Sequence, residues 1–117
     1  MRGVTRRINE IVFDCADPAT LARFWSALLG APVEVRDPDW ATVAADPVLI
    51  GFQRVPEGKQ SPKNRLHLDV EDADLLGAAA AAEALGATRL GDVIEDEGGG
   101  FLVLADPEGN EFCFVTG

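Results

Sequence analysis

The chain has 117 residues, which suits one folded domain and leaves no room for two independently stable ones. Twenty acidic against ten basic residues give a net charge of −10, and so negative a surface repels nucleic-acid phosphates and anionic lipid. We therefore expect no nucleic acid and no membrane partner. No apolar run approaches the roughly 20 residues that span a bilayer, and we expect no secretion signal, because the charged start lacks an apolar segment behind it.

The cysteine content indicates the cellular compartment. The chain has two cysteines, Cys15 and Cys113, and two thiols without an export signal are typical of a reducing environment. We expect a cytoplasmic protein without a disulfide.

The second half of the chain repeats the first. Residues 41–55 and 101–115 share six identical residues at an offset of 60, and Leu28–Ala31 matches Ala84–Ala87 at an offset of 56. Asp-Pro and Leu-Gly pairs are common, so either match alone is compatible with chance. Two blocks in the same order favour an internal duplication. The change in offset places the extra residues of the second half near Gly98–Gly100.

The first half reads as a strand, a helix and three strands. Asp17 and Pro18 supply a helix N-cap and a first-turn proline, an apolar stripe with helical spacing follows, and Gly30 ends the helix. Strands are expected at residues 8–14, 32–36, 40–45 and 48–54.

The second half repeats this order. An alanine-rich helix is expected at residues 73–85, ended by Gly86, and Asp106–Gly109 has the residues of a type I turn. Strands are expected at residues 65–70, 88–94, 101–105 and 111–116, with Glu95–Glu97 as an exposed hairpin tip. The sequence therefore predicts an α+β fold in a single domain, residues 1–117. Its tandem βαβββ modules, residues 8–55 and 65–116, are joined by a linker at 56–64 and form a curved mixed sheet around a central cleft, with the helices outside.

Each module must bury one face of its sheet under its helix. Strand residues alternate between faces, so the apolar positions of the first strands identify the buried faces. These positions are Ile11 and Phe13 in the first half and Leu66, Leu68 and Val70 in the second.

The opposite faces carry polar side chains. Glu10 lies on the first strand, and we place His67 at the matching position of the second half. On the last strands the repeated phenylalanines point to the helices, so the neighbouring Gln53 and Cys113 point the other way. If a pseudo-twofold axis relates the modules, the four side chains meet in one cleft.

Several motifs resemble a known family. They are the duplicated βαβββ pattern, Asp14–Pro18 leading into Leu21–Trp25, the strand Lys63–Asp69, and Leu104–Cys113. Together they resemble the vicinal oxygen chelate superfamily, and within it the branch of glyoxalase, bleomycin resistance and dioxygenase domains. The resemblance covers nearly the whole chain and implies the fold more specifically than the reaction.

The resemblance also implies a ligand set. Metal-dependent members chelate one divalent ion with inward His, Gln or Glu side chains, and these positions fall here on Glu10, His67 and Cys113, and less directly on Gln53. Only His67 is a usual ligand at its own position, because Glu10 stands where His or Gln is common and Cys113 stands where a carboxylate is usual. A carboxylate, an imidazole and a thiol favour no single ion, and a nearby carboxylate opposes deprotonation of the thiol. A divalent metal is therefore possible as a cofactor but not favoured.

Other interpretations of these residues stay open. Glu10 and His67 are candidate catalytic residues, because a carboxylate beside an imidazole supports acid–base chemistry without a metal, whereas a lone histidine is often structural. Cys113 suits simple packing, and Trp40 suits either a wall of the cleft that stacks on a ligand or partial burial.

Three functions remain for a protein with such a cleft. The altered ligand set favours a binding protein for a small organic molecule, with weak or no metal dependence. The alternatives are a metal-dependent lyase, isomerase or dioxygenase, and a structural or regulatory domain whose cleft is filled. Relatives of this length often dimerise, so we expect a homodimer.

Overall fold

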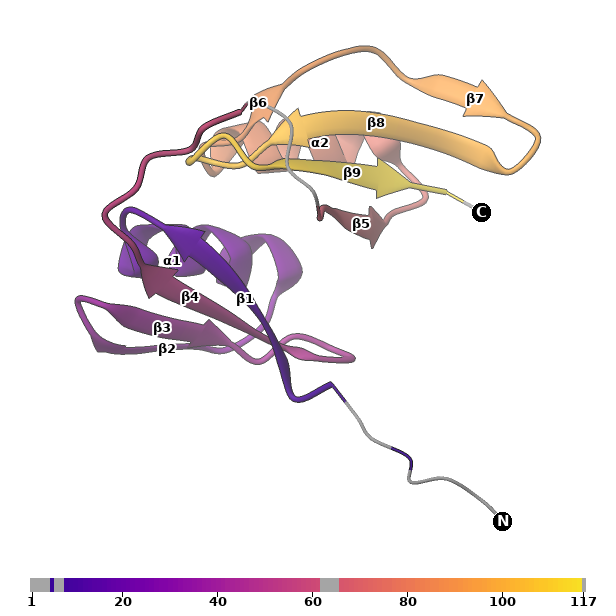
Figure 1. Cartoon of the computed structure of the whole chain (residues 1–117). Helices are drawn as coiled ribbons and strands as arrows, with labels where there is room; N and C mark the ends of the chain where they lie inside the picture. The colour runs from indigo at the N-terminus through magenta and orange to yellow at the C-terminus, as the bar shows by residue number, and fades with distance from the viewer. Residues whose placement is uncertain (1–4, 6–7, 62–65, 117) are drawn as a thin grey trace. The chain divides into compact units, whose positions relative to one another are not determined.

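The computed structural model describes residue 5 and residues 8–61 and 66–116. The chain divides into two compact units, Met1–Pro56 and Glu57–Gly117. Both follow the same order of strand, helix and further strands (Figure 1), so the α+β fold of two tandem modules is confirmed. The predicted start of the fifth strand, at Arg65, and Lys63 of the quoted motif lie outside the described residues.

The first unit is a four-stranded mixed sheet with the strand order β1-β4-β3-β2. Its first and last strands pair in parallel, and the other pairs are antiparallel. The helix packs on β2, β3 and β4. The elements are β1 (Glu10–Cys15), α1 (Pro18–Leu29), β2 (Val33–Asp37), β3 (Trp40–Val43) and β4 (Leu49–Arg54).

Helix α1 begins and ends where the sequence predicts. The Asp17 carboxylate accepts hydrogen bonds from the Thr20 hydroxyl at 2.7 Å and the Thr20 backbone N–H at 3.2 Å. Pro18 occupies the first turn, and Gly30 ends the helix at φ +66°, a conformation that a side chain disfavours.

An aromatic cluster fills the core between α1 and the sheet. The Phe13 ring lies edge-on to Trp25 at 6.2 Å and to Phe52 at 5.5 Å between centroids. Trp25 and Phe52 are fully buried. Phe13 and Phe52 are paired neighbours on β1 and β4, so the predicted covered face of the first sheet is confirmed.

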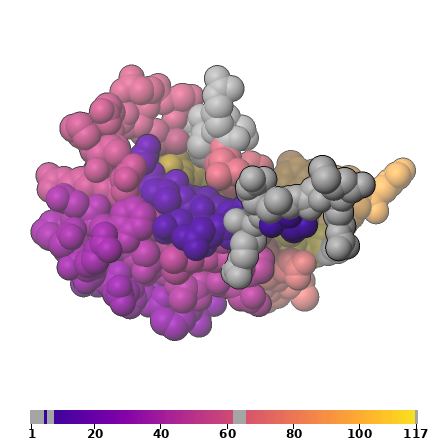
Figure 2. Space-filling model, turned by 60° about the horizontal axis from the view of Figure 1, so that its bottom comes forward, coloured from indigo at the N-terminus to yellow at the C-terminus, as the bar shows by residue number. Residues whose placement is uncertain are grey.

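The second unit has the same sheet topology, β5-β9-β8-β6, with β7 paired to β8. The parallel pair is again formed by its first and last strands, and its helix packs on β6, β8 and β9. The hairpin that joins β7 to β8, in orange, projects from this unit (Figures 1 and 2). The elements are β5 (Leu68–Glu71), α2 (Leu75–Ala84), β6 (Thr88–Arg89), β7 (Ile94–Asp96), β8 (Gly99–Ala105) and β9 (Glu111–Val115).

Two predicted details of the second unit are wrong. Residues 88–94 do not form one strand, because the chain leaves β8 after Leu90 and the Arg89 side chain donates to the Gly91 carbonyl at 2.7 Å. Residues 95 and 96 belong to β7, so the tip is the turn at residues 97–98. The prediction that Gly86 ends α2 is confirmed, because Gly86 follows the cap Leu85 at φ +116° and its N–H donates to the Glu83 carbonyl at 3.1 Å.

The predicted turn after β8 is confirmed. The Gly109 N–H donates to the Asp106 carbonyl at 2.8 Å. The buried Asp106 carboxylate accepts from the backbone of Glu108 and from the backbone and side chain of Asn110. This turn fixes the register of β8 against β9. In the described part of the chain, neither helix is long and apolar enough to cross a membrane.

The cap of α1 generates a prediction about pH. The Thr20 hydroxyl, and then the Thr20 N–H, lower the pKa of Asp17. A carboxyl group whose pKa is lower in the folded state stabilises the fold above its unfolded pKa, and this contribution is lost as the pH falls through the folded value. We expect Asp17→Ala to lower the free energy of unfolding by about 1 kcal/mol at pH 7, and by less as the pH falls below about 4.

Urea denaturation from pH 7 to pH 3 measures the effect. Asp17→Asn is the matched control, because its amide oxygen also caps the helix but does not titrate. An Asp17→Ala penalty that stays constant down to pH 3 would contradict the assignment.

Candidate functional site

The open face of the second sheet gathers polar side chains from neighbouring strands. Asp69 of β5 lies beside Cys113 of β9, and His67 immediately precedes β5. Ligand atoms of these three residues all lie within 4.8 Å of one another. The sequence prediction that His67 and Cys113 lie together on one face is confirmed.

Asp69 orients the imidazole. Its Oδ1 lies 3.3 Å from His67 Nδ1, so a proton on Nδ1 points to the carboxylate and Nε2 remains for a ligand. The side chains of His67 and Asp69 are 45% and 54% exposed, whereas Cys113 is half-buried. The three side chains offer the imidazole Nε2 as a hydrogen-bond acceptor, a carboxylate and a thiol to one incoming molecule.

A cavity of about 410 Å³ opens over this trio. Apolar side chains of Phe101 and Val115, which are paired on β8 and β9, form part of its wall. The β7–β8 hairpin closes one side of it. The other lining residues are Asp96, Gly98, Gly99, Gly100 and Thr116.

Glu10, the other candidate catalytic residue, lies on the open face of the first sheet. Its Oε2 is buried and has no hydrogen-bond partner among the described residues. A Cβ atom placed on Gly51 would lie 2.7 Å from this oxygen and 2.8 Å from Cη2 of Trp40. Glu10 and Trp40 therefore share the space that a side chain at Gly51 would fill.

Gln53 does not lie beside Glu10. Its neighbour on β1 is Asp14, to which its amide donates at 2.8 Å. Glu10 is four residues away on that strand, a separation of roughly 13 Å at about 3.3 Å per residue. The prediction that Gln53 joins Glu10 in one cluster is wrong within this unit. The two side chains lie on the same face of the sheet but at different positions along the strands.

The strand registers also correct the alignment of the two halves. Glu10 lies as many residues before the helix cap Asp17 as His67 lies before the cap Asp74, so these two residues correspond as predicted. By the same count, Val12 corresponds to Asp69. Val12 pairs with Gly51 and Asp69 pairs with Cys113. The counterpart of Cys113 is therefore Gly51 and not Gln53, and the offset between the last strands is 62 instead of 60.

The same counting makes Trp40 the counterpart of Phe101. Trp40 pairs with Gln53, and Phe101 pairs with Val115. These partners lie two residues after Gly51 and Cys113 on their strands. Each unit thus places an aromatic ring and at least one ionisable side chain on its open face. The meeting of the two sets in a common cleft stays a prediction.

Sequence reasoning missed two residues of the second unit. Asp69 was not assigned to the site, although its spacing of two from His67 indicates the same face. Phe101 follows three glycines, and only the pairing with Val115 reveals its orientation.

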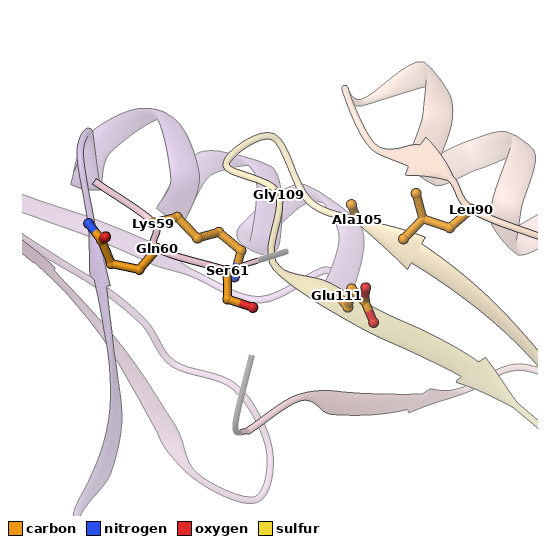
Figure 3. Close-up of a pocket in the computed structure, with 7 residues that line it drawn as sticks. All are labelled: Lys59, Gln60, Ser61, Leu90, Ala105, Gly109 and Glu111. Carbon is orange, nitrogen blue, oxygen red and sulfur yellow. The ribbon is translucent and has the colours of Figure 1, made fainter. Parts of the chain in front are cut away.

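A second cavity, of about 400 Å³, lies in the same unit near the Asp106–Gly109 turn. Figure 3 shows Lys59, Gln60 and Ser61 on one side of it and Leu90, Ala105 and Glu111 on the other. Lys59 and Glu111 bring charges of opposite sign to its wall. None of the side chains expected in the site lines this cavity.

The trio fits a metal ion as well as an organic ligand. Imidazole, carboxylate and thiolate are zinc ligands, and ligand atoms on one tetrahedral ion lie roughly 3.5 Å apart. The ligand atoms of the trio, within 4.8 Å of one another, would have to move closer to reach that spacing. His67, Asp69 and Cys113 would hold the ion, which would polarise a bound oxygen as a Lewis acid.

Comparison with known proteins agrees with this architecture. A family model described as a glyoxalase-like domain matches residues 10–115. The chain belongs to the glyoxalase-like domain family. No curated protein matches its sequence.

Solved structures share the fold at low identity. A glyoxalase/bleomycin resistance/dioxygenase family enzyme from Burkholderia phytofirmans is 18% identical, with 92% of this chain and 96% of that chain covered and a TM-score of 0.79. The fosfomycin resistance protein FosX from Listeria monocytogenes is 12% identical, with coverage of 97% and 95% and a TM-score of 0.79. A bleomycin-binding protein from Streptomyces verticillus, solved with copper(II)-bleomycin, is 18% identical, with coverage of 97% and 99% and a TM-score of 0.67.

The hairpin beside the trio depends on Gly99. This residue has φ +126°, and a methyl group there would collide with the backbone oxygen of Thr116. We expect Gly99→Ala to lower the free energy of unfolding by at least about 1 kcal/mol, because both strain and collision oppose it.

Urea denaturation measures this loss, with Gly98→Ala as the control. A Cβ at Gly98 meets nothing closer than an Asp96 oxygen at 3.4 Å, so this change should have a smaller effect. Equal stability of the two variants would contradict the assigned role of Gly99.

Proposed function

We propose that this glyoxalase-like protein binds a small organic molecule on the open face of its second unit. The polar end of the ligand lies at His67, Asp69 and Cys113, and its apolar body lies against Phe101 and Val115. The observation that carries the proposal is the cavity of about 410 Å³ that holds both kinds of side chain. Ligand sites combine an apolar wall with a few convergent polar groups in this way.

The chemistry of the trio selects the kind of polar end. The Asp69 carboxylate accepts hydrogen bonds, and the Asp96 carboxylate adds a second negative charge to the lining. Anionic ligands are therefore repelled, whereas a hydroxyl or amine donor is satisfied. The size of the cavity favours binding over a filled structural face, since drug-sized sites begin at about 300 Å³.

A simple probe tests this proposal. We expect 4-methylphenol to shift the backbone amide resonances of Phe101, Cys113 and Val115 in a saturable manner, because its ring fits the apolar wall and its hydroxyl donates to the trio. Asp69→Asn should weaken this binding at least fivefold, since one charged acceptor is lost.

Toluene is the matched probe without a donor. It should bind at least fivefold more weakly than 4-methylphenol. Identical shifts with both molecules, or no shift at the three pocket amides, would disprove the proposal.

The second candidate function is metal-dependent catalysis as a lyase, isomerase or dioxygenase. It is favoured by the three ligand atoms within 4.8 Å of one another. If it is correct, protein purified without chelator should carry more than about 0.5 equivalents of one transition metal per chain by elemental analysis. His67→Ala and Asp69→Ala should each lose that metal.

Asp72→Ala is the control, because it removes a carboxylate outside the trio. A metal content below about 0.1 equivalents, together with no thermal shift on adding zinc, iron(II) or nickel ions, would exclude this second function.

A further inference from the structure

We propose that strand β2 of the first unit pairs with β2 of a second copy of this chain, so that the two first-unit sheets join edge to edge about a twofold axis. This interaction surface lies outside the second-unit cavity of the proposed function and does not depend on it. It gives the expected homodimer a specific interface and names the residues that determine the association.

The first observation is an edge strand whose backbone groups face outward. β2 is the outermost strand in the order β1-β4-β3-β2 (Figure 1). The Ala44 N–H donates to the carbonyl of Pro32, the residue opposite it in the ladder, at 2.9 Å. Because hydrogen-bonded and non-hydrogen-bonded pairs alternate in an antiparallel ladder, the N–H and C=O groups of Val33 and Val35 point away from β3. Such groups are the template to which another strand adds.

The second observation is apolar surface along the same edge. Val33 pairs with Val43, and Val35 pairs with Ala41. Both partners are buried, so the two valines lie on the face that α1 covers, yet they remain 37% and 36% exposed. Val35 also lines a cavity of about 580 Å³ at the start of α1, together with Ala19. A second apolar strand beside β2 would cover this surface, and burial of apolar surface drives most protein association.

The third observation is charge complementarity, which selects a second copy of β2 as the partner. In an antiparallel pair centred on Val35, Glu34 of each copy lies opposite Arg36 of the other. Both charges lie on the open face, because Glu34 alternates with the valines and the Arg36 guanidinium carbon lies 5.8 Å from the centroid of the Trp40 ring. Opposite charges directly across a ladder stabilise the pair. The strand is therefore complementary to itself.

Charge also selects one register among the possible ones. A pair that places Val33 opposite Val35 brings the two Glu34 carboxylates face to face, and like charges directly opposite are destabilising. A pair centred on Val33 places Glu34 opposite Pro32 and compensates neither charge. The register centred on Val35 is the one that pairs both charges in each copy.

The contact is short, and it closes at two chains. The register of β2 against β3 shifts between Val35 and Asp37, and such a bulge ends regular pairing at an edge. A twofold axis uses one β2 from each copy, so the assembly does not extend into a fibre. Small interfaces are typical of weak association, and we expect a dimer that dissociates on dilution.

Sedimentation velocity between about 10 µM and about 1 mM measures the association. We expect a monomer–dimer equilibrium for the wild type. Glu34→Arg and Arg36→Glu should each weaken it on the order of tenfold, because like charges then face each other twice in every dimer. Glu83→Arg reverses an exposed charge on α2 of the second unit and should leave the association constant within twofold of the wild type.

An equimolar mixture of the two charge variants distinguishes this interface from any other surface. The Glu34→Arg chain carries two arginines on β2, and the Arg36→Glu chain carries two glutamates, so only the mixed pair places opposite charges across from each other. We expect the mixture to associate within twofold of the wild type although neither variant does so alone. Such a rescue cannot arise if either variant is misfolded.

Three results would overturn the proposal. They are a wild-type chain that stays monomeric up to about 1 mM, a dimer that neither charge reversal weakens, and a mixture that associates no more strongly than the separate variants. Failure of 4-methylphenol to bind the second unit would overturn the proposed function and leave this interface intact.

Discussion

Each sheet is covered by its helix on one face only, and this constraint determines where every other feature lies. The covered face takes the apolar residues that form the core, such as Phe52 in the first unit and Phe112 in the second. Strand residues alternate, so their immediate neighbours are forced onto the uncovered face. Glu10, Trp40, Cys113 and Phe101 owe their positions to this alternation. The candidate site residues therefore lie on the faces turned away from the helices.

Local signals in the sequence predicted most of the fold. The Asp17 cap, Pro18 and Gly30 define α1 to the residue, and Asp106–Gly109 forms the predicted turn. These features are encoded within a few neighbouring residues, which explains why they can be recognised without tertiary information. The prediction of one strand at residues 88–94 was wrong for the opposite reason. Its interruption depends on how Arg89 folds back on Gly91, which no periodicity reveals.

The candidate site was predicted only in part, because its composition depends on register. The pattern of identical residues aligned Gln53 with Cys113, whereas the parallel pairing aligns Gly51 with Cys113. An alignment that is shifted by two residues keeps each side chain on the same face of the sheet but moves it to another position along the strand. The two-residue alternation of strands therefore cannot detect such a shift. Gly51 contributes space instead of a functional group, and the residues made important by that space become visible only in three dimensions.

The parallel pairing of first and last strands also has a consequence for how the chain folds. The Asp14 and Gln53 side chains that bond across β1 and β4 are 39 residues apart in sequence. Bringing such distant segments together costs loop-closure entropy before any contact between them forms. Each module can complete its sheet only when its final strand is available, so a nascent module gains its full pairing once that strand has been synthesised.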